Sequence, residues 1–211
     1  MTSDDLRLIV AFLLFLIQNG GQSFPVPLLI RNVNVVDVVH GGLLAGMHVE
    51  ISNHKILSVT PASQVPQRPR SQIVDAGGKF LMPGLWDMHV HIYFDPKTYF
   101  SLLLANGVTG VRDMGGPPDW LLWWRKRVDR GDVIGPRMVV AGSYLDGPTS
   151  SRELVVRIGT PDEARRAVAS LAARGVDFIK IMSVVPREAY FAAAGEANRL
   201  GIPFVGHVRK R

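Results

Sequence analysis

Two histidines, His89 and His91, stand two residues apart in the segment 85–92, whose other positions are mostly apolar. If this segment is a β-strand, alternate side chains leave the same face, and both imidazoles therefore point the same way. Neutral imidazole is a good ligand for zinc and similar divalent metals, and two neighbouring imidazoles can chelate one ion. A His-x-His pair on a strand is more commonly structural than metal-binding, so its meaning depends on the rest of the chain.

Lys180 lies in the segment 176–182, which is otherwise almost entirely apolar. A buried ammonium without a partner is costly, so this lysine lies at the open end of a strand, is paired, or is chemically altered. Desolvation lowers the pKa of a lysine, and the neutral amine can take up carbon dioxide as a carbamate. The two oxygens of a carbamate are suited to bridging two metal ions about 3.5–4 Å apart. The alternative is a strand-end lysine in a salt bridge.

His207 lies near the end of the next strand-like segment, 203–208. It is either a further metal ligand or a hydrogen-bonded core histidine.

The elements that must position these residues follow a repeated pattern after Gly78. Strand-like and helix-like segments alternate, and Thr160-Pro161-Asp162-Glu163 is typical of a helix start with a capping box. Repeated β-α units predict a parallel sheet, either doubly wound or a (β/α)8 barrel, in which the carboxyl ends of the strands meet at one mouth. The predicted strands are 85–92, 108–113, 137–142, 176–182 and 203–208, and the predicted helices are 97–105, 119–130, 162–174 and 187–200.

The part of the chain before this repeat alternates apolar and polar residues with a period of two. Strands are predicted at 29–38, 47–51 and 55–59, the last two joined by a hairpin-like connection. We therefore expect a small all-β unit over residues 25–80, followed over 81–211 by about five β-α units that form either an open parallel sheet or the front half of a longer barrel.

The first 24 residues form a separate segment. Residues 8–17 are an unbroken apolar run, too short to span a bilayer core of about 30 Å comfortably, and small and polar residues follow it. This pattern predicts a signal peptide and a secreted or periplasmic protein without a stable membrane span. A membrane anchor and a buried N-terminal helix are the alternatives.

Composition narrows the chemistry further. The chain has no cysteine, which excludes disulfides, thiolate-bound zinc and a cysteine nucleophile. Its net charge of +6 comes from 24 Lys and Arg against 18 Asp and Glu spread along the sequence. No aromatic residues are interleaved with the basic ones for base stacking, and we therefore expect no nucleic-acid partner.

Residues 74–91 and 107–113, in this order and spacing, together with the β-unit before them, resemble the amidohydrolase superfamily of metal-dependent hydrolases. The strand Phe178-Ile179-Lys180-Ile181 is most similar to the imidazolonepropionase- and Xaa-Pro dipeptidase-like branch. The resemblance covers nearly all residues from Leu28 to Val208. It implies a small β-sandwich-like unit over residues 25–80 and, over 81–211, a partial (β/α)8 TIM-type barrel of about five β-α units that corresponds to the N-terminal portion of the family's fold.

The resemblance also implies a metal centre with one or two divalent ions, most commonly zinc. His89 and His91 would bind the first ion, Lys180 as a carbamate would bridge both ions, and His207 would bind the second. A water activated by the metals would then attack a carbonyl group of the substrate. The family also uses a His after the sixth strand and an Asp after the eighth, so we expect the general-base Asp beyond Arg211 and little activity from these 211 residues alone.

The function implied is hydrolysis of carbon–nitrogen bonds in small linear or cyclic amides or in dipeptide-like substrates. A Xaa-Pro dipeptidase-like metallopeptidase, a mononuclear deaminase with an unmodified Lys180, and a non-catalytic fragment are the alternatives. A homo-oligomer is compatible with the sequence.

Overall fold

The structure is a computed structural model that describes residues 26–64, 71–92 and 95–208. The segment predicted to be a signal peptide, 1–24, lies outside the described residues. The chain divides into two compact units, one made of Met1–Leu85 with Ala105–Gly107 and the other of Trp86–Leu104 with Val108–Arg211. Within the described ranges, no helix combines the length and the apolar character that crossing a membrane requires.

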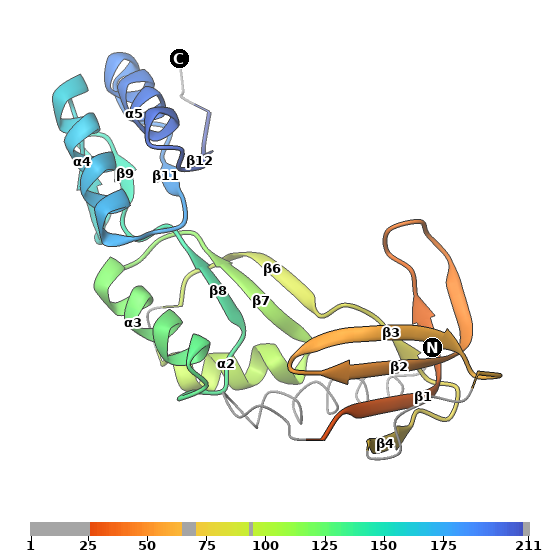
Figure 1. Cartoon of the computed structure of the whole chain (residues 1–211). Helices are drawn as coiled ribbons and strands as arrows, with labels where there is room; N and C mark the ends of the chain where they lie inside the picture. The colour runs from red at the N-terminus through yellow and green to blue at the C-terminus, as the bar shows by residue number, and fades with distance from the viewer. Residues whose placement is uncertain (1–25, 65–70, 93–94, 209–211) are drawn as a thin grey trace. The chain divides into compact units, whose positions relative to one another are not determined.

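The first unit is a β-structure built on one mixed sheet (Figure 1). Its order is β3-β2-β1-β4, with β5 also paired to β1; β2 is antiparallel to both β1 and β3, whereas β4 and β5 run parallel to β1. Leu28, Ile30, Val33 and Val49 form its core. The described strands make a single sheet, so the predicted sandwich stays a prediction. The bounds are β1 (Leu28–Val36), β2 (Leu43–Ser52), β3 (Lys55–Pro61), β4 (Gln72–Asp75) and β5 (Phe80–Leu81).

The second unit begins with a three-stranded sheet in the order β6-β7-β8. Its strands are β6 (Leu85–Val90), β7 (Val108–Asp113) and β8 (Arg137–Val140), and the helices between them are α2 (Pro96–Ala105) and α3 (Pro118–Asp129). Phe100 of α2 and Leu121 and Trp124 of α3 pack against buried side chains of the strands, among them Val111 and Val140. Trp120 and Trp123 of α3 stack on each other with ring centroids 5.8 Å apart. These apolar contacts hold β6 and β7 in place.

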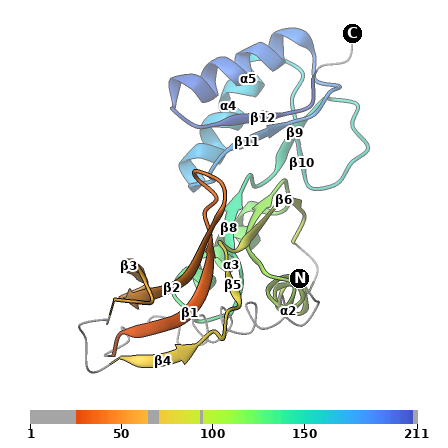
Figure 2. The same ribbon diagram turned by 90° about the vertical axis from the view of Figure 1, so that its right-hand side faces the viewer.

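A four-stranded sheet, ordered β10-β9-β11-β12, completes the second unit, and its paired strands are all parallel. Leu145 and Ile181 of this sheet share one apolar core with Val168 and Ala193, which lie on the two helices of this part. Figure 2 shows those helices, α4 and α5, side by side next to the sheet. The bounds are β9 (Tyr144–Asp146), β10 (Val155–Arg157), α4 (Pro161–Arg174), β11 (Ile179–Ile181), α5 (Arg187–Arg199) and β12 (Phe204–Gly206).

Asp177 connects the two sheets of this unit. Its backbone N–H donates to the carbonyl of Val140, and its carboxylate accepts hydrogen bonds of 2.8 Å from the Val140 backbone N–H and 2.7 Å from Arg125. These charge-assisted hydrogen bonds to the Asp177 carboxylate hold the start of β11 beside the end of β8.

The predicted α/β class is confirmed: all five strands of the predicted repeat and all four helices are present. The capping box at Thr160 and Glu163 is also observed, with Pro161 in the first turn and Gly175 as the left-handed C-cap. Strands β9 and β10 were not predicted, and several predicted strands are shorter than expected. The described strands of the second unit form two sheets and no closed barrel. The five-unit partial barrel therefore stays a prediction.

Candidate metal centre

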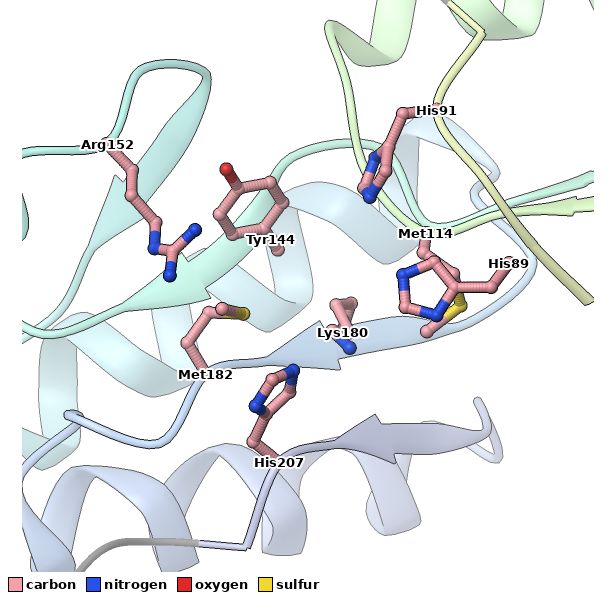
Figure 3. A pocket seen from close by; sticks show the side chains of 8 residues that line it. All are labelled: His89, His91, Met114, Tyr144, Arg152, Lys180, Met182 and His207. Atoms are coloured by element: carbon pink, nitrogen blue, oxygen red, sulfur yellow. The ribbon is translucent and has the colours of Figure 1, made fainter.

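The structure brings all four predicted site residues to one cavity of about 250 Å³ in the second unit. Figure 3 shows the three imidazoles arranged around the Lys180 amine. The residues that line the cavity are His89, His91, Met114, Tyr144, Arg152, Lys180, Met182 and His207.

His89 and His91 come from the carboxyl end of β6 and lie on either side of the buried Val90. Their ring centroids are 5.5 Å apart. Two imidazoles that share a tetrahedral ion at Zn–N distances of about 2.0–2.1 Å place their ring centres roughly 5 Å apart, so this separation suits chelation. The alternation of the strand thus produces the predicted pair.

The orientation of His91 is fixed by a backbone carbonyl. Its Nδ1 lies 2.8 Å from the carbonyl oxygen of Gly115, and since a carbonyl can only accept, Nδ1 carries the proton. The Nε2 atom then holds the lone pair. A ligating histidine in proteins is commonly held this way, with its second nitrogen bonded to a carbonyl or carboxylate.

Asp113 is the last residue of β7 and is fully buried. Its two carboxylate oxygens accept hydrogen bonds of 2.6 Å from the Ile92 backbone N–H and 2.9 Å from the Gly115 backbone N–H. Burial raises the pKa of Asp113, while these two hydrogen bonds and the nearby His91 act in the opposite direction. Asp113 therefore joins the end of β6 to the turn whose carbonyl orients His91.

Lys180 is at the centre of β11, where its neighbours Ile179 and Ile181 are both buried, and only 5% of its own surface is exposed. Burial, followed by the positive charge of Arg112, lowers the pKa of its amine. A larger fraction of neutral amine follows, and this is the form that reacts with carbon dioxide.

His207 directly follows β12 and is placed by the pairing of β12 with β11. Its backbone N–H donates to the carbonyl of Ile181 at 3.0 Å. Gly206 has φ +152°, and a Cβ at this position would lie 2.1 Å from the same carbonyl oxygen. Only glycine therefore allows β12 to approach β11 closely enough to bring His207 beside Lys180.

In the part of the chain that the structure describes, the side chains that line the cavity include three imidazoles, an amine and a guanidinium but no carboxylate. Burial is the largest cause of the lowered pKa of His89, followed by the charges of Lys180, His91, Arg112 and His207. These causes favour the neutral form of His89, whose lone pair is then available. Nitrogen donors of this kind suit a divalent metal ion, which their lone pairs would coordinate.

The three imidazoles do not form a compact triad. In the part of the chain that the structure describes, no three His, Cys, Asp or Glu side chains lie close enough together to hold one ion. The donors that fit are the His89–His91 pair, with the Lys180 amine and His207 across the cavity from it.

Four lining residues were not predicted: Met114, Tyr144, Arg152 and Met182. Tyr144 is in β9, and Arg152 is in the loop that connects β9 to β10. Neither stretch has a periodicity that would place it at the cavity. Met182 directly follows the predicted Lys180 strand, and its alternation with Lys180 was the one available signal.

No family model matches this chain, whereas curated proteins and solved structures do. The chain is 40% identical over 96 residues to adenine deaminase 2 of Agrobacterium fabrum, a match that covers 44% of this chain and 15% of that protein. It is 34% identical over 113 residues to dihydroorotase of Carboxydothermus hydrogenoformans, covering 47% of this chain and 25% of that protein.

A solved prolidase, in complex with N-methylphosphonate-L-proline, superposes with a TM-score of 0.71 and 25% identity, covering 86% of this chain and 56% of that one. These relatives and solved structures indicate the amidohydrolase superfamily, as predicted from the sequence. The chain spans only about a seventh to a quarter of the length of these curated amidohydrolase relatives.

Proposed function

We propose that this chain supplies the metal-binding part of an amidohydrolase that cleaves carbon–nitrogen bonds of small linear or cyclic amides. The observation that carries the proposal is the meeting of His89, His91, Lys180 and His207, from three separate strands, in one cavity. The similarity to a dihydroorotase and a prolidase, both named for hydrolytic reactions, supports the same reaction class.

In the proposed site, His89 and His91 would hold one ion and His207 a second, and Lys180, as a carbamate, would be a ligand shared by both. The metals, when bound, supply Lewis acidity and lower the pKa of a coordinated water. The protein's part is to present His91 with its proton on Nδ1 and its Nε2 lone pair free, through the Gly115 carbonyl, and to favour the neutral form of the Lys180 amine by burial. Among the described residues, no carboxylate lines the cavity, so we expect these 211 residues to bind metal and to turn over slowly without an added general base.

A mononuclear deaminase is the second candidate, and the match to adenine deaminase favours it. In that reaction Lys180 stays an unmodified amine. Metal content and the state of Lys180 separate the two candidates. We also propose export of the protein, on the pattern of residues 1–24.

The test is a measurement of bound zinc by mass spectrometry, combined with a ¹³C NMR spectrum of protein incubated with ¹³C-bicarbonate. The proposal expects two ions per chain and a carbamate signal that disappears in Lys180→Ala. His89→Ala and His207→Ala should each lose about one ion. His40→Ala is the matched control, because His40 is an exposed histidine of the first unit.

One ion per chain and no carbamate signal would replace the two-metal proposal with the deaminase. Unchanged metal content in the His89→Ala and His207→Ala variants would reject the site itself.

A further inference from the structure

Helix α3 has two tryptophans outside the core of the second unit. The helix buries Leu121 and Trp124 against the sheet β6-β7-β8. Trp120 and Trp123, by contrast, are 41% and 45% exposed. Two neighbouring indoles with this much apolar surface outside the core form a surface patch that folding alone does not explain.

The two outer indoles are held in place by other aromatic rings. They stack on each other, and both meet the buried Trp124 edge to face, with centroid distances of 5.7 Å for Trp120 and 4.8 Å for Trp123. Trp124 is in turn packed on Phe100 of α2 at 5.7 Å. A ligand that binds these indoles therefore meets side chains that are already ordered, which reduces the entropy lost on binding.

Three cations continue the same side of the helix. Lys126, Arg127 and Arg130 follow Trp123 by three, four and seven residues, the spacing of one helical face. The Arg127 guanidinium lies 4.9 Å from the centroid of the Trp123 ring, and Lys126 and Arg130 are exposed. The face made of Trp120, Trp123, Lys126, Arg127 and Arg130 is termed the tryptophan stripe.

The carboxylates near the tryptophan stripe do not neutralise it. Asp119 lies on the same side of α3 but pairs with Arg174 of α4 at 3.2 Å. Asp129, six residues after Trp123, falls on another side of the helix. Among the residues that the structure describes, no ion pair joins the three cations of the stripe to a carboxylate. The stripe thus combines three positive charges with an exposed aromatic pair.

We infer that the tryptophan stripe binds the surface of an anionic phospholipid membrane, with its indoles at the level of the head groups and its cations on the lipid phosphates. Tryptophan favours the membrane–water interface because the indole joins a large apolar ring to an N–H donor. Lysine and arginine beside it are attracted by anionic head groups. A helix that lies on a membrane surface in this way has both features on its exposed side.

The size of the aromatic patch favours a membrane over a protein partner. At these exposures the two indoles present roughly 130–220 Å² between them. A stable protein–protein interface buries about 800 Å² on each side. A charged membrane surface needs less contact area, because its attraction acts on all nearby cations of a chain whose net charge is +6.

The test is co-sedimentation of the full chain with phosphatidylcholine vesicles that contain either no anionic lipid or about 30 mol% phosphatidylglycerol. We expect the native chain to bind the anionic vesicles about 10-fold or more tightly than the neutral ones. Trp120→Ala combined with Trp123→Ala should weaken binding to the anionic vesicles by about 10-fold or more, since the apolar contact is lost. Lys126→Gln combined with Arg130→Gln should reduce the anionic preference by about 5-fold for each cation removed.

Two variants of other helices are the matched controls. Phe191 of α5 is 59% exposed and has the Arg187 guanidinium 5.1 Å from its ring centroid, so it repeats the pairing of an exposed aromatic with a cation. Arg166 is an exposed cation of α4. Phe191→Ala and Arg166→Gln should bind both kinds of vesicle as the native chain does. Lys126→Gln with Arg130→Gln alters only exposed side chains, so it decides the question even where the tryptophan variant fails to fold.

Equal binding of the two kinds of vesicle by the native chain, or native binding by both stripe variants, would overturn the inference. So would an oligomer that the tryptophan variant dissociates in analytical ultracentrifugation while neither vesicle is bound, because the stripe would then contact a second copy of the chain. None of these measurements involves metal or turnover, and the inference is therefore independent of the proposed function.

Discussion

The connection from Asp113 through Gly115 to His91 shows how a residue that touches no substrate can set the geometry of the proposed metal centre. Both carboxylate oxygens of Asp113 accept from backbone N–H groups, and one of those groups belongs to the residue whose carbonyl orients His91. An asparagine cannot replace this carboxylate, because its amide nitrogen is a donor facing another donor.

Asp113→Asn is therefore expected to lower both stability and metal affinity. One buried N–H group loses its acceptor, which costs about 1–3 kcal/mol in the free energy of unfolding. Metal affinity should fall by about 10-fold or more, as for other groups that orient a ligand. Denaturant unfolding and zinc titration measure the two effects, with the exposed Asp119→Asn as control. Native zinc affinity in Asp113→Asn would show that the turn at Gly115 does not position His91.

The four predicted site residues were accessible from the sequence because each depends on a local rule. His89 and His91 follow from strand alternation, and Lys180 and His207 from the meeting of parallel strands at their carboxyl ends. Arg152 and Tyr144 follow no such rule. Their positions depend on the loop after β9, which the buried Asp146 carboxylate holds by accepting hydrogen bonds from Gly147 and Ser150. These hydrogen bonds have no periodic signature in the sequence.

At the scale of elements, the close pairing of β11 and β12 is the contact that brings Lys180 and His207 together. It depends on Gly206, since any Cβ there meets the carbonyl of Ile181. The second unit also has a glycine without such a constraint: Gly195 lies in α5, with no atom within 4 Å of a Cβ built on it.

These two glycines predict opposite responses to the same substitution. Gly206→Ala should destabilise the protein by about 2 kcal/mol or more, because both the clash and the positive φ oppose alanine. It should also reduce zinc content by displacing His207. Gly195→Ala should stabilise the protein by up to about 1 kcal/mol, since alanine is the better helix former. Thermal unfolding measures both, and a neutral Gly206→Ala would mean that β12 does not depend on this close approach.

The elements themselves were largely predictable. The helix at α4 begins and ends where its capping signals are, at Thr160 and Gly175. Strands β9 and β10 were missed because their few apolar residues lie among polar residues, glycine and proline, whereas β11 and β12, equally short, lie within longer apolar runs. The hydrogen bond from the Val140 backbone N–H to the Asp177 carboxylate could not be predicted either, because it joins residues 37 positions apart through a side chain.

At the scale of the whole molecule, the cavity that the Arg152 guanidinium lines belongs to a chain with a net charge of +6. Positive charge around a cleft raises the local concentration of ligands of opposite charge, and salt screens this attraction. The field therefore favours anionic ligands.

Binding of N-acetyl-L-alanine should accordingly weaken several-fold when ionic strength rises from about 0.01 to 0.1 M, over which the Debye length shortens from about 30 to about 10 Å. Binding of the uncharged N-acetyl-L-alanine amide should hardly change. A ligand-observed NMR titration of each compound at the two salt concentrations measures this difference. The same salt response for both compounds would assign no steering role to the cavity charges.

The tryptophans of the chain give these experiments an optical reporter. All four belong to the second unit: Trp86 of β6 and the three indoles of α3. Trp123 and Trp124 lie edge to face at 4.8 Å, and Trp120 stacks on Trp123, with the Arg127 guanidinium 4.9 Å from the Trp123 ring. Indoles this close couple their electronic transitions, so circular dichroism in the indole bands and intrinsic fluorescence report on the unit that holds the metal ligands, while the β-sheet unit remains spectroscopically silent in both.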